Sequence, residues 1–303
     1  MIGVGSIAFT IGRVEPLENM GVFQGDPGKM EGFRSMGMHR YARTSQAPVD
    51  LAFESVKKTL ERSPVPVDKI DALLYCTENG AGYSFYGQFA DWCVRLGLRN
   101  AFPIGLFMAG CGNFGSALHL SHGLLRNGAF RNILLVTVYV EQEGELRRLM
   151  EPAVGILGDG SASCLLSSEA PLDFQLEHTR ALAMNELGAI SPSREFLRYN
   201  LENYKGRKRI FDEFYAATEY RPGDFKVMIT NNYGLNTQKG FASESGMPMD
   251  AIFKENIPRW GHIQSSDVLI NLDSASPSLG RGDAAMLLST GPTTWAIGIV
   301  SKN

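Results

Sequence analysis

Residues 101–118 read AFPIGLFMAGCGNFGSAL, an apolar run that leads into Gly110-Cys111-Gly112 and then into a segment with helical spacing. An apolar run that ends at glycines is typical of a buried strand, and the spacing from Phe114 through Leu125 predicts an α-helix. The stretch therefore predicts a strand, a sharp turn and a helix. The cysteine lies at the turn, where its side chain can project from the N-terminus of the helix.

Cys111 has the surroundings of a nucleophile. At a helix N-terminus, unpaired backbone N–H groups and the positive end of the helix dipole favour the thiolate form of a cysteine. A thioester carbonyl that this thiolate attacked would place its oxyanion near the same N–H groups. The alternative is a buried cysteine that packs as a small apolar residue, and the local sequence leaves both interpretations open.

The same stretch also fits a dinucleotide-binding fingerprint. Gly110-Cys-Gly-Asn-Phe-Gly115 matches G-x-G-x-x-G between a strand and a helix, and Glu141 follows the next apolar strand, where an acidic ribose ligand would be expected. Such folds usually place the fingerprint in their first strand–helix unit, whereas here two strands and two helices precede it. A nicotinamide or flavin site is therefore the weaker hypothesis.

Outward from this stretch, strand-like segments alternate with helical patterns, which favours an α/β fold. The first half predicts strands over 3–10, 68–76, 101–109, 132–140 and 162–166, and helices over 47–62, 87–96 and 114–125. The pattern then starts again, with strands over 172–177, 225–231, 284–289 and 296–300 and helices over 205–219 and 235–243. Two similar halves that join near residue 170 would account for this repeat.

Composition limits the class of partner. The 29 lysines and arginines nearly balance the 32 aspartates and glutamates, so the net charge of −3 gives no bulk field that would gather nucleic acid or an anionic membrane. No apolar run approaches the roughly 18 residues of a membrane span, and the N-terminus shows no cleavage pattern. We therefore expect a cytoplasmic protein that binds neither nucleic acid nor membrane.

Metal binding is not expected from the sequence. The four cysteines, at positions 76, 93, 111 and 164, form no C-x-x-C pair. His119 and His122 lie three residues apart on one predicted helix, but no third ligand stands at a useful spacing. A partly buried helix face explains these two histidines better than a metal site.

Several motifs together resemble the thiolase superfamily, most closely β-ketoacyl-acyl-carrier-protein synthase III. Residues 107–118 followed by Gly128-Ala-Phe-Arg-Asn-Ile-Leu-Leu-Val resemble the nucleophile segment of that family. Leu157-Gly-Asp-Gly-Ser-Ala resembles its Phe-Gly-Asp-Gly-Ala-Gly turn, and residues 288–298 (LSTGPTTWAIG) resemble its C-terminal glycine-rich turn. With similar residues near the N-terminus and around Arg40, the likeness spans essentially the whole chain.

The resemblance implies a five-layer αβαβα fold of two pseudo-equivalent halves. Residues 1–170 would form the half that carries the nucleophile, and residues 171–303 the half that carries the other site residues. It also implies acyl transfer through an acyl-cysteine on Cys111, with no permanently bound cofactor. The donor would be a coenzyme A or carrier-protein phosphopantetheine thioester, so acyl carrier protein is a candidate partner. The expected assembly is a homodimer, with a heterodimer as the alternative.

Two catalytic positions differ from the family pattern. Ile229-Thr-Asn231-Asn232-Tyr-Gly corresponds to the family's His-Gln-Ala-Asn motif, so Asn231 stands where the histidine would. Trp260-Gly-His262 corresponds to its Gly-Asn-Thr-Ser motif, so His262 stands where the asparagine would. An imidazole can still take the thiol proton, and an amide can still donate to a carbonyl oxygen.

The resemblance assigns the remaining roles. His262 is the expected base and hydrogen-bond donor, and Asn231 the expected polarising donor. The backbone N–H groups of Cys111 and Gly291 would form the oxyanion hole. Asn232 and Arg40 are expected to bind substrate, Arg40 at the nucleotide end of the donor.

Three functions follow from this pattern. The first is decarboxylative Claisen condensation, as in synthase III, with Asn231 and His262 holding the enolate oxygen. Thiolase-type condensation requires a second cysteine near the C-terminus, and this chain has no cysteine after Cys164. The second function is acyl transfer to an amine or hydroxyl with His262 as base. The third is a subunit of a hetero-oligomeric ketosynthase that completes a partner's site.

Overall fold

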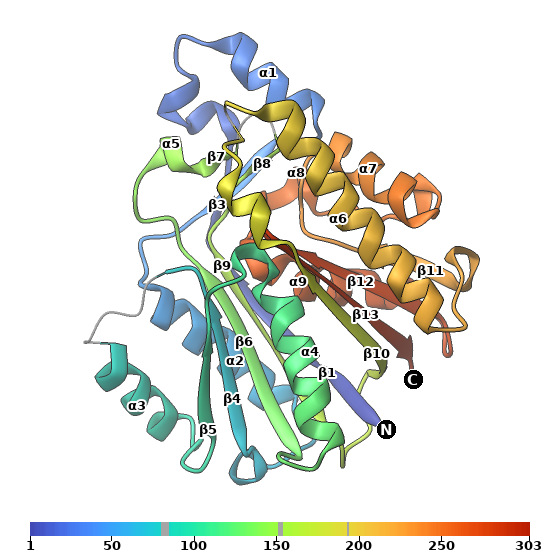
Figure 1. The fold of residues 1–303 in the computed structure, drawn as a ribbon. Coiled ribbons are helices and arrows are strands. Elements are labelled where there is room, and N and C mark those ends of the chain that lie inside the picture. The colour runs from blue at the N-terminus through green and yellow to red at the C-terminus, as the bar shows by residue number, and fades with distance from the viewer. Residues whose placement is uncertain (80–84, 151–153, 193) are drawn as a thin grey trace.

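The computed structural model describes residues 1–303 apart from 80–84, 151–153 and 193. Nine strands form its main sheet: β1 (Ile2–Ile11), β4 (Ala72–Thr77), β5 (Phe102–Leu106), β6 (Asn132–Tyr139), β9 (Gly160–Ser167), β10 (Phe174–Ala183), β11 (Phe225–Ile229), β12 (Ala284–Thr290) and β13 (Thr294–Lys302). Their order across the sheet is β11-β12-β13-β10-β1-β9-β6-β4-β5 (Figure 1). β1 and β10 join the two parts of the sheet through only a short pairing of Ile2–Val4 with Phe174–Leu176.

The two parts repeat one pattern of strand directions. From β1 outward, β1 and β9 are antiparallel, β9 and β6 are antiparallel, and β6 and β4 are parallel. From β10 outward, β10 and β13 are antiparallel, β13 and β12 are antiparallel, and β12 and β11 are parallel. The first part carries β5 in addition, parallel to β4. This repetition is what a duplicated α/β fold requires.

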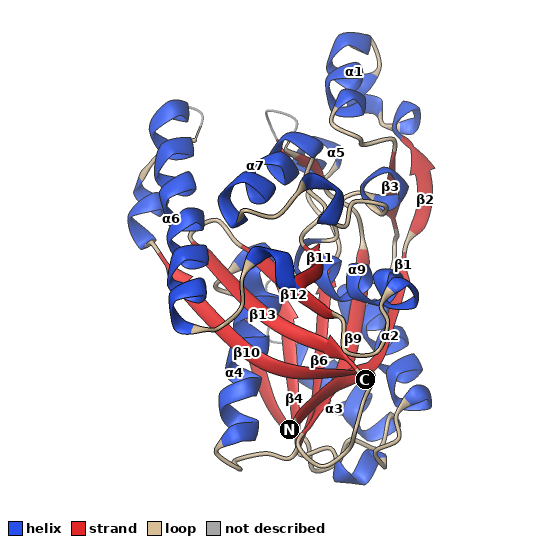
Figure 2. Ribbon diagram, turned by 90° about the vertical axis from the view of Figure 1, so that its right-hand side faces the viewer, coloured by secondary structure: helices blue, strands red, loops and turns tan. Residues whose placement is uncertain are grey.

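The larger helices lie in layers against this sheet (Figure 2). They are α2 (Pro48–Arg62), α3 (Phe85–Arg95), α4 (Asn113–Arg126), α6 (Phe196–Ala217), α7 (Leu235–Ser245) and α9 (Asp267–Ala275). α4 and α9 both contact strands of the two parts, so they form the middle layer. α2 packs on the first part and α6 on the second, and separate apolar cores lie beneath each. The five-layer arrangement expected from the motifs is confirmed.

A smaller region lies at the end of the molecule away from both termini (Figure 1). It contains β2 (Arg13–Pro16), paired with β3 (Arg40–Arg43), and α1 (Pro27–Ser35). The short elements nearby are α5 (Glu145–Arg148), β7 (Leu149–Met150), β8 (Gly155–Ile156) and α8 (Ile257–Trp260). Leu17, Met20 and Tyr41 belong to the buried core that holds this region together.

Every strand and helix predicted from periodicity has a counterpart in the structure. α1, β2, β3 and α9 were not predicted. α9 is hydrophobic almost all round, with Val268, Leu269 and Ile270 fully buried, so it lacks the amphipathic period by which a helix is recognised. Among the described residues, no helix combines the length and the apolar character needed to cross a membrane.

Candidate active site

Cys111 lies at the centre of a short 3-10 turn, Gly110–Gly112, that runs directly into α4. Gly110 adopts a φ of 56°, a conformation that a side chain would strain. Asn113 fixes the turn from inside, because its Oδ1 accepts a hydrogen bond from Ala109 N at 3.1 Å and its Nδ2 donates to Thr77 O at 3.4 Å. The Cys111 side chain is buried next to the C-terminal end of β4.

The glycine turn at Gly291 closes over the nucleophile turn. A Cβ on Gly291 would stand 2.0 Å from Ala109 O, and one on Gly112 would stand 2.9 Å from Gly291 N, so both positions need glycine. The N–H of Gly291 is donated to Thr294 O at 2.7 Å. That N–H is thus engaged within its own turn, and the geometry does not support its expected place in the oxyanion hole.

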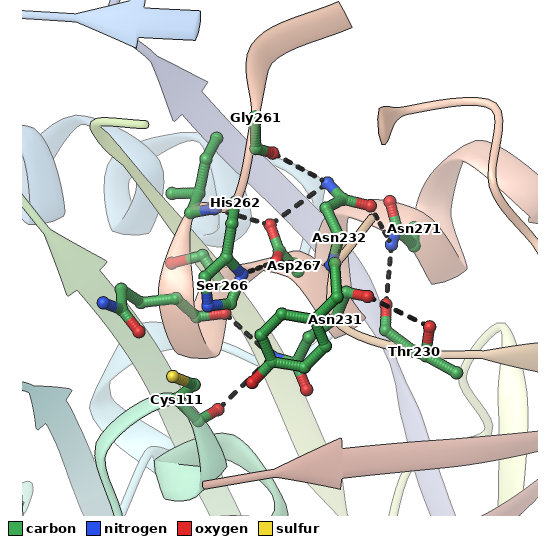
Figure 3. A network of polar contacts seen from close by, with 12 residues as sticks. Cys111, Thr230, Asn231, Asn232, Gly261, His262, Ser266, Asp267 and Asn271 are labelled. Carbon is green, nitrogen blue, oxygen red and sulfur yellow. Dashed lines mark hydrogen bonds and ion pairs between the residues drawn. The ribbon is translucent and has the colours of Figure 1, made fainter. Parts of the chain in front are cut away.

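Backbone hydrogen bonds hold His262 against Ile156 of β8 and against Gly158 of the Gly-Asp-Gly turn. Its N–H donates to Ile156 O at 2.7 Å, and its carbonyl accepts from Gly158 N at 2.9 Å. Gly261, which precedes it, has a φ of 79° and lies against Ile156 O, so no larger residue fits there. The imidazole is fully buried and lies on the same side of the polar network as Cys111 (Figure 3).

Asp267, the first residue of α9, binds the imidazole. Its Oδ2 contacts His262 Nδ1, and its two oxygens also accept hydrogen bonds from Ile263 N and Asn232 N, each at 2.8 Å. These donors stabilise the carboxylate, which in turn places the Nδ1 proton toward it. His262 Nε2 has no partner among the described residues. It is therefore the free nitrogen that can exchange a proton at the nucleophile.

Electrostatics favour the protonated imidazole. Burial acts to lower the pKa of His262, but the charges of Asp267 and of the Cys111 thiolate outweigh it and raise this pKa to about 10. Tyr233 packs against the imidazole, with the two ring centroids 4.7 Å apart. Its pKa is raised well above the usual value by burial and by the negative charge at Cys111. The arrangement of Cys111, His262 and Asp267 has the chemistry that a nucleophile, a base and a group orienting the base would need.

Asn231 stands at the centre of the site but makes structural contacts with all its polar atoms. Its Nδ2 donates to Gln264 O at 3.0 Å and to Cys111 O at 3.4 Å. Its Oδ1 accepts from Thr290 N at 3.0 Å. The side chain therefore ties together the cysteine turn, the histidine segment and the strand before the glycine turn, which leaves no amide hydrogen for a substrate oxygen.

Asn232 also serves the protein rather than a substrate. It is buried, its Nδ2 donates to Gly261 O and to Asp267, and its Oδ1 accepts from Asn271 Nδ2 at 2.9 Å. The expectation that it binds substrate is not supported, because no polar atom of its side chain faces the site. It positions Asp267 instead.

Arg40 lies at the surface on β3. The helix α8, which ends two residues before His262, packs against this strand. The Arg40 side chain is exposed, and its expected contact with the nucleotide end of the donor stays a prediction. His119 and His122 are linked through Thr179 Oγ1. No cluster of metal-ligating side chains occurs in the described part of the chain.

Three polar groups near Cys111 were not predicted from the sequence. Asp267 was missed because α9 itself was not predicted. Gln264 has a positive φ of 48°, uncommon for a side-chain-bearing residue, and its buried Oε1 has no partner in the described structure. Glu78 follows β4, outside any recognisable motif.

Comparison with known proteins finds relatives along most of the chain. The chain is 22% identical over 261 residues to β-ketoacyl-[acyl-carrier-protein] synthase III of Fusobacterium nucleatum, across 78% of this chain and 77% of that protein. It is 27% identical over 265 residues to the protein of the same name from Phocaeicola vulgatus, across 80% and 77%. No protein-family profile matches.

Solved structures share the fold over the full length. ChlB3, described as an acyltransferase, superposes with a TM-score of 0.84 at 19% identity, over 99% of this chain and 97% of that one. OleA from Xanthomonas campestris superposes with a TM-score of 0.81 at 16% identity, over 99% and 98%. The fold is thus that of the thiolases, and the relatives indicate an acyl-transferring or condensing enzyme. The chain has the fold of the thiolases and is similar in sequence to β-ketoacyl-[acyl-carrier-protein] synthase III.

Proposed function

We propose that the protein is an acyltransferase that carries its acyl group as a thioester on Cys111 and passes it to an amine or hydroxyl acceptor. The Cys111 thiolate attacks a coenzyme A or carrier-protein thioester, and the His262 imidazolium gives its proton to the departing thiolate. The neutral His262 Nε2 then takes a proton from the acceptor as the acceptor attacks the acyl carbon. Cys111 leaves as thiolate, which restores the starting ion pair.

The observation that carries this proposal is the contact between His262 Nδ1 and Asp267. With Nδ1–H directed at a carboxylate, the neutral imidazole presents a lone pair at Nε2, as a base must. Holding an enolate oxygen for decarboxylative condensation calls instead for two hydrogen-bond donors. Asn231 has donated both amide hydrogens elsewhere, so only a protonated His262 could serve. Heteroatom transfer therefore fits these residues better than condensation.

The relatives support both chemistries in different ways. The curated relatives bear the name of a condensing enzyme, and the solved structure of ChlB3 bears the name of an acyltransferase. Because Cys111, His262 and Asp267 all come from one chain, a role limited to completing a partner's site is less well supported.

We further propose a homodimer, because β5 is an edge strand of the described sheet and carries the exposed Phe102.

Acceptor assays on the acylated enzyme test the proposal. Enzyme acylated on Cys111 would be mixed with malonyl-coenzyme A, with primary amines or with alcohols, and products would be separated by mass spectrometry. We expect amide or ester product, and a loss of roughly 10²–10⁴-fold in transfer rate for His262→Ala. Release of CO₂ with a β-ketoacyl product, and none from amines or alcohols, would assign condensation instead.

A further inference from the structure

A cavity of about 580 Å³ opens beside the nucleophile turn, between the ends of β4 and β5 and the helix α3. Most of its wall is apolar, with contributions from Tyr75, Phe89, Ile104 and Leu106. Glu78 contributes the one carboxyl group among the described residues that line it. Glu78 is exposed, so its carboxyl group is open to a ligand that enters this cavity.

Glu78 stands next to the reacting cysteine. Its carboxyl carbon lies 3.8 Å from the point that a Cβ on Gly110 would occupy. The residues on both sides of it are fixed, because Thr77 O accepts from Asn113 Nδ2 and the Asn79 amide exchanges two hydrogen bonds with the backbone of Val140. The position of Glu78 is thus set by the same asparagine that fixes the Cys111 turn.

The Glu78 carboxyl group has no hydrogen-bond or ion-pair partner among the described residues. Within the described part of the chain, the carboxylate that contacts His262 is that of Asp267, so Glu78 is not needed to orient the base. Glu78 is exposed to solvent, and the protein atoms around it still raise its pKa to about 7 by partial loss of hydration, against a smaller opposing effect of the His262 charge. A group of this kind can both bind a cation and accept a proton near neutral pH.

The number of protons distinguishes the two acceptor classes. A hydroxyl acceptor loses one proton during transfer, and His262 can accept it. A primary amine enters as an ammonium ion and must lose two protons, one before it attacks and one afterwards. A second base beside the nucleophile is needed only for the amine, and a negatively charged one also matches the charge of the ammonium ion.

We propose that Glu78 binds the ammonium group of an amine acceptor in this cavity and takes its first proton. This inference rests on the proposed function and assigns its acceptor. The free amine then attacks the acyl-Cys111 carbonyl, the C–N bond forms, and the C–S bond breaks to release the Cys111 thiolate. His262 takes the second proton and becomes the imidazolium again. Glu78 gives its proton to water, so one thioester and one ammonium ion yield one amide, one thiol and one proton.

A matched acceptor pair tests this assignment. Enzyme acylated beforehand with acetyl-coenzyme A would receive 2-phenylethylamine or 2-phenylethanol, which share an apolar body and differ in the reacting group. We expect faster transfer to the amine, and a loss of roughly 10- to 100-fold for the amine alone in Glu78→Gln, as for removal of a hydrogen bond to a charged group. Glu143→Gln, which removes an exposed surface carboxylate, should leave both rates unchanged.

A binding measurement separates this inference from the proposed function. Titration calorimetry with Cys111→Ala protein needs no acylation, and should show tighter binding of the amine than of the alcohol, with the difference removed by Glu78→Gln in the same background. Equal or undetectable binding of the two compounds, or a Glu78→Gln effect that is the same for both, would overturn the assignment. Failure of Cys111 to acylate would overturn the proposed function and leave this binding result interpretable.

Discussion

At the scale of single residues, the site depends on how Asp267 holds one ring nitrogen of His262. In addition to its contact with the imidazole, the carboxylate accepts hydrogen bonds from the backbone N–H groups of Ile263 and Asn232. Hydrogen bonds of this kind stabilise the ionised form of a carboxyl group. A fixed negative charge then keeps the imidazole in one orientation and in one tautomer.

Asp267→Asn should reverse the electrostatics of His262. Without the carboxylate, burial is opposed only by Cys111, so the pKa of His262 falls well below about 10. The sign follows from the charge, since a nearby anion favours the imidazolium and desolvation disfavours it. Nitrogen-detected NMR titration of the imidazole would show a protonated ring at pH 8 in the parent protein and a neutral ring in the variant. Acyl transfer should fall by roughly 10²–10⁴-fold.

The control for this change is Asp273→Asn on the same helix, where the carboxyl group lies by a separate cavity with Arg62 and Asp173. It should leave the titration of His262 unchanged. If Asp267→Asn also left that titration unchanged, the assigned role of Asp267 would be wrong.

At the scale of elements, β5 is the edge strand at one end of the described sheet, in the part that carries Cys111. Its outer edge pairs with no other described strand. Phe102 on β5 is 60% exposed, and Phe107 and Met108, which follow the strand toward Cys111, are 64% and 86% exposed. An open edge with large apolar side chains is normally covered in a native protein. A second copy of the chain is the occupant that we expect.

Light scattering on the purified protein should give twice the chain mass of 33.2 kDa. Phe102→Lys should shift the protein toward the monomer, because it places a charge on the apolar edge. Leu197→Lys is the matched control, since Leu197 is 82% exposed on α6, away from that edge, and this variant should stay dimeric. A parent protein that stays monomeric at micromolar concentration would contradict the expected assembly.

The elements that were predictable from sequence are those with a clear period. The α2 pattern buries Val49, Ala52 and Val56 on one face, and all eight residues of β6 are buried, as expected of a strand covered on both sides. α9 had no such signal, because it is buried on most sides between the two parts of the sheet. Its first residue is Asp267, so the missed helix also concealed the orienting carboxylate.

At the scale of the whole molecule, motifs singled out Cys111 and His262 as candidate site residues but did not predict what their neighbours contact. Cys111 and His262 are 151 positions apart in sequence, and the fold brings them to one site. Asn231 and Asn232 were expected to act on substrate because they stand in a catalytic motif. Asn231 instead joins its segment to the cysteine turn in the first half, and Asn232 joins segments within the second half, through tertiary contacts that no local pattern reveals.

The account depends most directly on the acylation of Cys111. Intact-mass spectrometry after incubation with acetyl-, butanoyl- and malonyl-coenzyme A, or with the same acyl groups on carrier protein, measures it. We predict a single acyl adduct that hydroxylamine removes, that is absent from Cys111→Ala, and that persists in Cys93→Ala, which removes the partly exposed cysteine on α3. The account would be contradicted if no donor gave an adduct, or if the adduct remained in Cys111→Ala.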